Sequence, residues 1–389
     1  MKKTTRVNHP PIVELPPGNR PLVEPIYQTV KFEFDTVEET EAYLRGERAG
    51  FYYSRTSNPT TRQLEQLLAE LQGRDDCLVT ASGVGAIAQT LLALTKQSDH
   101  VVCFVETYNP TRYLIRRLLG RFGVTHTLLS IEDLAGVERA LATQPTRLVY
   151  FESPTNPVTK IADIAALTRL ARAAGALSVM DNTFAGFHQH GGFEVDVFVH
   201  SLTKYASGTG DVMGGAVIAR TELIRALRTD FSALGGTLDP HAAFLIVRGM
   251  KTYFVRYAAQ SASAARIAAM LAAHPAVTRV HYPGLPTHPQ HALAARQMQD
   301  FGTIVTFDLR GGTDAARRFA NAVELFALTA SLGSTESLAV TAHMLGGREL
   351  NAEQQRISAI TDGTVRLSIG LEDTDDLIAD LTRALAAAG

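Results

Sequence analysis

Residues 195–205 read Val-Asp-Val-Phe-Val-His-Ser-Leu-Thr-Lys-Tyr, an apolar run that leads into a lysine set among hydroxyl residues. The β-rich start of this run predicts a buried strand, which places Lys204 just beyond the carboxyl end of that strand. An amine in a partly dry pocket loses its proton more easily than an amine in water, and it becomes nucleophilic near neutral pH. Such a lysine can form an imine, although a solvated charge at a strand end is the more ordinary interpretation of this stretch by itself.

Five more β-rich runs precede this one, and helix-like segments lie between most of them. The predicted strands cover residues 77–81, 101–105, 125–129, 147–151, 177–180 and 195–199, and the predicted helices cover 84–95, 111–121, 132–142 and 161–174. Alternation of this kind predicts an α/β fold with a mostly parallel sheet covered by helices on both faces. Ligands of such folds bind at the carboxyl ends of the strands, which is where Lys204 lies.

The pattern changes on either side of this region. Residues 1–60 are rich in proline and weakly periodic, which indicates an N-terminal arm that lies on another surface. A long alanine-rich helix is expected from Thr252 to Ala273, followed by strands near 303–309, 326–329 and 364–369 and by helices at 313–322 and 373–388. We therefore expect three parts, namely the arm over residues 1–60, a large cofactor-binding domain over 61–250 and a smaller C-terminal α/β domain over 251–389.

The composition excludes several classes of protein. The 389 residues carry a formal charge of −2, with 46% hydrophobic and 20% charged residues, so neither a nucleic-acid partner nor a polybasic membrane anchor is expected. No apolar run is long enough to span a bilayer, and polar, proline-rich sequence follows Met1-Lys2-Lys3 where a signal peptide has its apolar core. We expect a cytoplasmic protein with a small-molecule partner, in which Cys77 and Cys103 are buried, reduced thiols.

Four further groups fall at predicted strand ends. The glycine-bearing turn 81–86 leads from a strand into a helix, and its free amides suit a phosphate, although a tight turn without a ligand is equally common. Asp181 ends an apolar strand, where a capping role is the commoner one. Tyr108 follows another strand, and a loop tyrosine more often packs than reacts. Residues 152–157 form a proline-stiffened loop around Asn156, which is a weak signal by itself.

Taken together, these groups supply what pyridoxal phosphate requires of a protein. Lys204 offers an amine for the imine, Asp181 an acid for the pyridinium nitrogen and Tyr108 a ring that stacks on the cofactor, while the turn 81–86 offers amides for the phosphate. A carboxylate beside the ring nitrogen keeps that nitrogen protonated, so the ring can take up electrons released at the substrate. Pyridoxal phosphate is therefore the expected cofactor, and no metal is expected.

From about residue 25 to its end, the chain resembles the Cys/Met-metabolism (trans-sulfuration) family of pyridoxal-phosphate enzymes. The most specific motifs are Tyr53-Ser54-Arg55-Thr56-Ser57-Asn58-Pro59-Thr60, Ser201-Leu202-Thr203-Lys204-Tyr205, Ser331-Leu332-Gly333 with Glu336-Ser337-Leu338, and Arg366-Leu367-Ser368-Ile369-Gly370-Leu371-Glu372. The resemblance implies fold type I and a lyase or transferase of amino-acid biosynthesis or methionine and cysteine metabolism. Methionine γ-lyase, cystathionine γ-lyase and γ-synthase, and O-acylhomoserine sulfhydrylase belong to this family.

The resemblance also implies a role for each site residue. Lys204 would hold the cofactor and then move protons, Asp181 would pair with the ring nitrogen, and Tyr108 would stack on the ring and assist proton transfer. The remaining roles would be phosphate binding by the Gly83 and Val84 amides and the Ser201 and Thr203 hydroxyls, and substrate-carboxylate binding by Asn156, Arg366 and the Ser331 backbone. Tyr53 and Arg55 would reach the phosphate of the neighbouring subunit, so a homodimer would be the catalytic unit and a homotetramer the usual assembly.

Several positions depart from the family pattern. Asn109-Pro110 replaces the usual glycine-containing pair after Tyr108, Gly208-Thr209-Gly210-Asp211 replaces the usual Gly-His-Ser-Asp run, and Thr341-Ala342-His343-Met344 replaces a proline-led segment. Ala330 stands where cystathionine-handling γ-enzymes tend to carry a glutamate, so the distal ammonium of cystathionine would lack a partner. We therefore favour γ-elimination or γ-replacement on a methionine- or homoserine-like amino acid, with β-elimination of the cystathionine β-lyase type as the alternative.

Other classes of function receive less support from the sequence. Gly208, Gly210 and Gly214 hint at a dinucleotide loop, but the apolar run 215–219 follows where that fingerprint requires a helix. His188 and His190 lack a third ligand at a metal-site spacing, so we expect them in a surface loop. A non-catalytic binding protein of the same fold is the most distant alternative. The presence of Lys204 and its partners argues against it, because such a protein would not need them.

Overall fold

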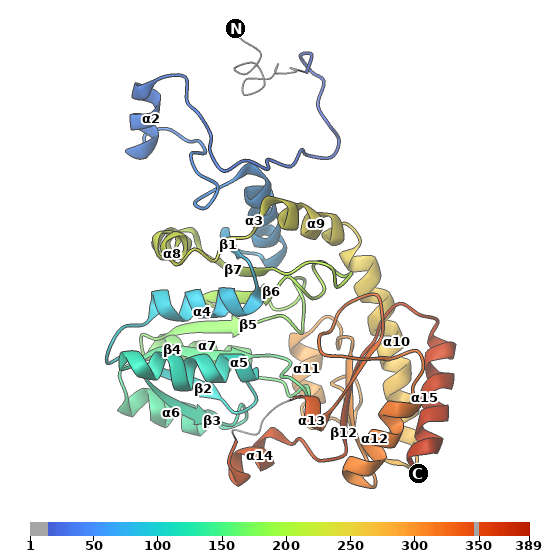
Figure 1. Cartoon of the computed structure of the whole chain (residues 1–389). Helices are drawn as coiled ribbons and strands as arrows, with labels where there is room; N and C mark the ends of the chain where they lie inside the picture. Colours follow the sequence, from blue (N-terminus) through green and yellow to red (C-terminus); the bar gives the residue numbers. More distant parts are fainter. Residues whose placement is uncertain (1–14, 346–349) are drawn as a thin grey trace.

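The computed structural model describes residues 15–345 and 350–389, and its central feature is a seven-stranded sheet (Figure 1). In spatial order the strands are β1 (Asp76–Thr80), β7 (Gly215–Ala219), β6 (Val197–Ser201), β5 (Leu177–Asp181), β4 (Thr146–Glu152), β2 (His100–Phe104) and β3 (Thr125–Leu129). The pairings from β6 to β3 are all parallel, as the strand–helix alternation predicts. The carboxyl ends of these strands therefore meet at one edge of the sheet.

One strand runs against the others. β7 pairs antiparallel with both β1 and β6, and it is the apolar run that argued against a dinucleotide loop in the sequence. Because β7 runs back toward the opposite edge, it needs no crossover helix after β6. The loop between β6 and β7 therefore stays at the carboxyl edge and carries Lys204 there.

Helices cover both faces of the sheet. One face packs against α3 (Pro59–Gln72), α6 (Leu134–Thr143), α7 (Ile164–Ala173) and α9 (Pro240–Met250), and the other against α4 (Gly83–Leu94), α8 (Thr221–Leu234) and the helical segment of residues 109–122. That segment begins as α5 (Asn109–Tyr113) and continues as a π-helix and a 3-10 turn. Since successive side chains of a strand point to opposite faces, Phe198 joins one core and Val197 and Val199 join the other.

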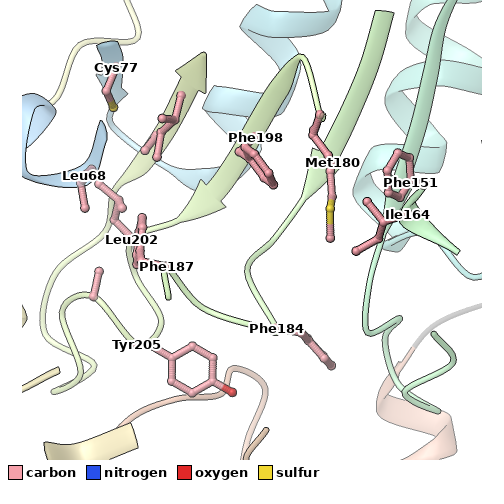
Figure 2. Packing of buried hydrophobic residues seen from close by; sticks show 14 of the residues in the cluster. Leu68, Cys77, Phe151, Ile164, Met180, Phe184, Phe187, Phe198, Leu202 and Tyr205 are labelled. Atoms are coloured by element: carbon pink, nitrogen blue, oxygen red, sulfur yellow. The ribbon is translucent and has the colours of Figure 1, made fainter. Parts of the chain in front are cut away.

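The first of these cores shows how neighbouring strands contribute to one layer. Phe198, Met180 and Phe151 come from β6, β5 and β4, and their side chains lie on the same side of the sheet (Figure 2). Leu202 and Tyr205 extend this layer beyond the end of β6, and both are at most 2% exposed. The residues on either side of Lys204 are therefore anchored in the core, which fixes the backbone from which the lysine projects.

The C-terminal part of the chain forms a second sheet with its own core. Its strands are β10 (Ala327–Leu328), β11 (Leu338–Thr341), β12 (Thr364–Ser368), β9 (Ile304–Leu309) and β8 (Val277–His281), and helices α10 (Tyr253–Ala273), α12 (Gly312–Ala322) and α15 (Thr374–Ala388) pack against it. Three short helices, α11 (His291–Gln297), α13 (Ala342–Leu345) and α14 (Ala352–Ser358), complete this part. The sequence predicted three of the strands and missed β8 and β11. The domain boundaries after residues 60 and 250 stay predictions.

The arm differs from both sheets. Residues 15–58 run away from the body as extended chain with one short helix, α2 (Val37–Leu44) (Figure 1). Phe34, Tyr43 and Tyr52 form a small aromatic cluster with ring centroids 5.4–6.4 Å apart, yet α2 has no buried residue. The first fourteen residues of the predicted arm, Met1-Lys2-Lys3 included, lie outside the described residues.

Two smaller predictions can be compared with this fold. Cys77 and Cys103 are both buried and free, as expected. Over the described ranges, no helix is both long and apolar enough to cross a membrane.

Candidate active site

A cavity of about 490 Å³ opens at the carboxyl edge of the large sheet, where the second sheet closes over it. Ten of the twelve site residues predicted from the sequence line this cavity: Gly83, Val84, Tyr108, Asn156, Asp181, Ser201, Thr203, Lys204, Ser331 and Arg366. They come from positions up to about 280 residues apart. Eight of them lie at or after strand ends of the large sheet, as the strand-end rule predicts, whereas Ser331 and Arg366 come from the second sheet and its loops. Tyr53 and Arg55 do not line it.

Lys204 is the central amine of the cavity. Its Nζ donates a hydrogen bond of 2.8 Å to Ser331 Oγ. Burial, helped by the positive charge of Arg366, lowers the pKa of Lys204 from 10.5 to about 8. A sizeable share of this amine is therefore uncharged near pH 8, which is the form that attacks a carbonyl or removes a proton.

The first turn of α4 forms a cradle opposite the end of β6. Ser82 caps the helix by accepting a 3.0 Å hydrogen bond from Gly85 N, and the amides of Gly83 and Val84 have no partner inside a helix at these positions. A Cβ built on Gly83 would lie 2.6 Å from Ser201 Cβ, so the turn packs closely against Ser201 and only glycine fits at residue 83. Free amides at a helix N-terminus bind phosphate well, and these amides line the same cavity as Ser201 and Thr203, so the donor set fits the phosphate of pyridoxal phosphate.

Asp181 ends β5 and is 9% exposed. One of its oxygens, Oδ1, accepts a hydrogen bond of 3.0 Å from Thr183 N. Burial raises the pKa of this carboxyl above its ordinary value, although hydrogen bonds from Thr183 partly oppose the effect. A buried carboxyl of this kind gains from a cationic partner, and a pyridinium N–H is such a partner.

Tyr108 stands at the mouth of the cavity with 39% of its surface exposed. Its backbone N–H donates to Oε1 of Glu152, the last residue of β4. Glu152 lines the cavity too and is 5% exposed, but no role is predicted for it from the sequence. It sits at the end of an apolar strand just as Asp181 does, and that shared position is the signal by which it could have been found.

Arg366 occupies the far side of the cavity and is 4% exposed. Its Nη1 donates to Asn156 Oδ1 at 2.8 Å and its Nη2 to the Ser331 carbonyl at 2.9 Å, while its buried Nε has no partner among the described residues. Ser331 has a φ of 99°, an uncommon conformation for a residue with a side chain, and such conformations recur at functional sites. The guanidinium is thus held in place by two of its five N–H donors.

Tyr53 and Arg55 lie on the arm, away from this cavity. Arg55 stands 5.7 Å from the centre of the Tyr53 ring and donates from Nη1 to the carbonyl of Ser232 at 2.8 Å. Tyr53 keeps 40% of its surface exposed. Within one chain, therefore, these two residues are not brought to the ten others.

The two histidines considered for a metal site are not in an exposed loop, contrary to our expectation. His190 is 4% exposed and bonds through Nδ1 to Asn182 Oδ1, and His188 bonds to Asp300 Oδ2 at 2.7 Å. No cluster of three potential ligands occurs within residues 15–345 and 350–389. These hydrogen bonds tie the loop after β5 to its neighbours, although Nε2 of His190 has no partner among the described residues.

A half-buried lysine that lines one cavity with a phosphate cradle and a buried acid, at the carboxyl edge of this α/β sheet, defines a fold type I pyridoxal-phosphate enzyme. Comparison with known families specifies it further, since a family model described as Cys/Met metabolism PLP-dependent enzyme matches residues 14–386. The chain belongs to that family. It is accordingly an enzyme that depends on pyridoxal phosphate.

Named relatives agree with this assignment. An L-methionine gamma-lyase of Pseudomonas putida is 42% identical over 94% of this chain and 93% of its own length, and an O-succinylhomoserine sulfhydrylase of Pseudomonas aeruginosa is 40% identical over 94% and 91%. Among solved structures, a cystathionine gamma synthase from Xanthomonas oryzae superposes with a TM-score of 0.89 at 37% identity, covering 94% of this chain and 93% of that one. The fold type and the cofactor predicted from the sequence are confirmed.

Proposed function

We propose that this enzyme catalyses γ-elimination or γ-replacement on a methionine-like or O-activated homoserine-type amino acid. The observation that carries the proposal is a set of apolar residues in the cavity lining, called the apolar wall below: Pro110, Met213, Ala330, Val340, Met344 and Leu345. An apolar wall favours a thioether or a short acyl group over a charged one, because a buried charge without a partner is costly. The relatives named above act on such substrates or on close derivatives.

Lys204 is proposed to hold the cofactor and, once displaced by the substrate amine, to act as the general base. Bound pyridoxal phosphate supplies an electron sink for the charge that develops at the substrate α-carbon. Asp181 keeps the ring nitrogen protonated, and this requires the carboxylate form that the pyridinium stabilises. Because Lys204 has its pKa lowered to about 8, it can both take up and return a proton near neutral pH.

Arg366 is proposed to bind the substrate carboxylate. Its two Nη atoms are already held by Asn156 and Ser331, so the fork has little freedom to turn. The N–H donors that these two bonds leave over would pair with a carboxylate. Fixing the carboxylate orients the α-proton toward one base, and Tyr108 is proposed to stack on the ring and assist in moving a proton to the leaving group.

Expulsion of a γ-substituent requires a second proton loss, from the β-carbon of the substrate. Lys204 is proposed to move both protons, and the proposal is supported by its place in the lining of the same cavity as the cradle residues and Arg366. A β-substituent leaves after the first proton loss alone, so the same residues would serve a β-lyase. What separates the two is the length of side chain that the apolar wall accepts.

The arm is proposed to complete the site of a second copy. Tyr53 and Arg55 would reach the phosphate cradle of the partner subunit, which would make the homodimer the catalytic unit and a homotetramer its assembly. Support comes from the exposed apolar side chains of the arm, Leu22, Val23, Tyr27 and Val30 among them, which need a covering surface. We also propose a cytoplasmic location, in keeping with two buried cysteines that are both free.

A panel of substrates tests the reaction. Methionine, cystathionine, cystine, homocysteine, O-acetylhomoserine and O-succinylhomoserine are each incubated with the holoenzyme, with and without a thiol, and 2-oxobutyrate, pyruvate and replacement products are scored separately. We expect methionine or O-acetylhomoserine to give the highest kcat/KM, with 2-oxobutyrate or a γ-replacement product. Pyruvate as the sole product would overturn the γ-assignment in favour of β-elimination.

A further inference from the structure

Two carboxyl groups, not one, stand at the ring end of the cavity. Glu152 ends β4 and Asp181 ends β5, and the register of these parallel strands pairs the two residues directly. Directly paired residues of a sheet project to the same face, about 5 Å apart, so the two carboxyls are neighbours. Both are at most 9% exposed and both line the cavity.

Glu152 also holds the backbone of Tyr108. Oε1 of Glu152 accepts from Tyr108 N, which ties the loop after β2 to the end of β4. Arg112 holds the same loop from the other side by donating to the carbonyls of Val105, at 2.7 Å, and Thr107. Tyr108 is the N-cap residue of α5, and its side chain caps no amide of that helix. The bond to Glu152 therefore helps to set the backbone position from which the ring of Tyr108 enters the cavity.

The two carboxyls cannot both be ionised at low cost. The titratable and charged groups near Glu152 are Asp181 from β5, Tyr150 from β4 itself, Glu106 and Tyr108 from the loop after β2, and Arg112 from the helical segment. Burial, followed by the charge of Asp181, raises the pKa of Glu152 well above its ordinary value, and Arg112 offsets this only in part. A pyridinium next to Asp181 keeps Asp181 ionised, so the proton of the pair resides on Glu152.

We propose that Glu152 is a positioning residue, which as a neutral acid holds Tyr108 at the ring site and leaves Asp181 as the single carboxylate beside the pyridinium nitrogen. This inference rests on the roles proposed above for Tyr108 and Asp181. A neutral acid retains one oxygen that accepts from Tyr108 N and has an O–H to donate. Glutamine has the same shape and the same two capabilities, whereas aspartate is one methylene too short to reach Tyr108.

The test compares Glu152→Gln, Glu152→Asp and Glu152→Ala in the holoenzyme. We expect Glu152→Ala and Glu152→Asp to lower kcat/KM by about 30- to 100-fold and to release cofactor faster on dilution, because Tyr108 is no longer held. Glu152→Gln should recover most of this loss, to within about fivefold of the wild type. The pH midpoint of the cofactor absorbance should stay at its wild-type value in Glu152→Gln and shift in Glu152→Asp.

Two outcomes would overturn the inference. If Glu152→Gln is as impaired as Glu152→Ala, the residue works as an anion; if Glu152→Ala matches the wild type, it positions nothing. Glu65→Gln serves as the matched control, since Glu65 is also buried but is paired with Arg62 and Arg228 at the other end of the sheet. It should lower the melting temperature without moving the absorbance midpoint. A wild-type protein that binds no pyridoxal phosphate would instead contradict the proposed function itself.

Discussion

The cofactor cavity and the N-terminal arm hold residues from the same set of motifs, yet their surroundings are opposite. Around the cavity, Lys204 lies between Leu202 and Tyr205, which are at most 2% exposed, and Arg366 is 4% exposed. On the arm, Tyr53 is 40% exposed and Leu22 is fully exposed. The cavity residues have their partners within one chain, whereas the arm has few contacts to hold it.

This difference teaches which parts of the site one chain can build alone. Burial changes the chemistry of the cavity groups, as the lowered pKa of Lys204 shows. An exposed tyrosine and an exposed arginine gain no such change until another surface covers them. We therefore expect the cavity residues to act within their own chain and the arm residues to act only in an assembly.

The largest effect is expected at the centre of the cavity. Lys204→Ala should lower kcat/KM by about 10⁴-fold, because it removes both the attachment of the cofactor and the general base. Borohydride reduction followed by peptide mass analysis should find cofactor fixed to the Lys204 peptide of the wild type alone. Lys251→Ala, at an exposed helix end, is the control and should leave activity unchanged. Cofactor fixed to a different lysine would refute the assignment.

A smaller loss is expected at the carboxylate clamp. Arg366→Lys should lower kcat/KM by about 100-fold, mainly through KM, because an ammonium cannot make the contacts of Nη1, Nη2 and Nε together. Steady-state kinetics with the best substrate of the panel measures this. Arg318→Lys, which loses contacts to the carbonyls of Ala387 and Ala388 far from the cavity, should keep KM unchanged. An unaltered KM in Arg366→Lys would remove Arg366 from substrate binding.

Mixing two inactive variants tests the arm directly. Mixed dimers of Lys204→Ala and Arg55→Ala contain one site with both changes and one with neither. If the arm completes the partner's site, refolding the two together at equal amounts should restore about a quarter of the wild-type activity. Arg366→Ala mixed with Lys204→Ala is the control, because each site takes both of these residues from its own chain. Every site of this mixed dimer therefore keeps one of the two changes, and no activity should return. Recovery equal for both pairs would mean that the arm has no special part in the shared site.

The smallest effect is expected at His200, which lines the cavity. His200 is 2% exposed, donates to Gln72 Oε1 at 2.7 Å and stacks on Phe187, and burial lowers its pKa to about 3. The unfolded chain therefore binds a proton that the folded chain does not between pH 6.5 and 3, so stability falls as the pH falls through this window. His200→Gln should make that slope shallower by about 1 kcal/mol per pH unit, as measured by urea unfolding from pH 7 to 5. An unchanged slope would show that His200 is not held neutral.

Much of the fold and of the candidate site could be predicted from the sequence because it depends on local sequence patterns. Strand β6, the turn after β1 and the position of Lys204 follow from apolar runs and glycine, and eight site residues lie at or after strand ends of the large sheet. Ser331 and Arg366, which belong to the second sheet and its loops, followed only from the family motifs. The role of Glu152 was not predicted because it depends on Asp181, which is a neighbour of Glu152 only through strand pairing. Strands β8 and β11 were not predicted because the antiparallel pairings that stabilise them join residues that are distant in the sequence. The buried state of His188 and His190 likewise depends on Asp300 and Asn182, which no local pattern reveals.

The order of the strands has a consequence for synthesis of the protein. β1 leads into the phosphate cradle, but it lies at the edge of the sheet and pairs with β7, which is made on the order of 140 residues later. At roughly 5 to 20 residues per second, a ribosome needs about 7 to 30 s to cover that distance. The nascent chain thus spends this interval with the turn at Ser82 unsupported, and a fragment ending before Gly215 would have the sequence of the cradle without its shape. Cofactor capture is therefore a late event in the life of each new chain.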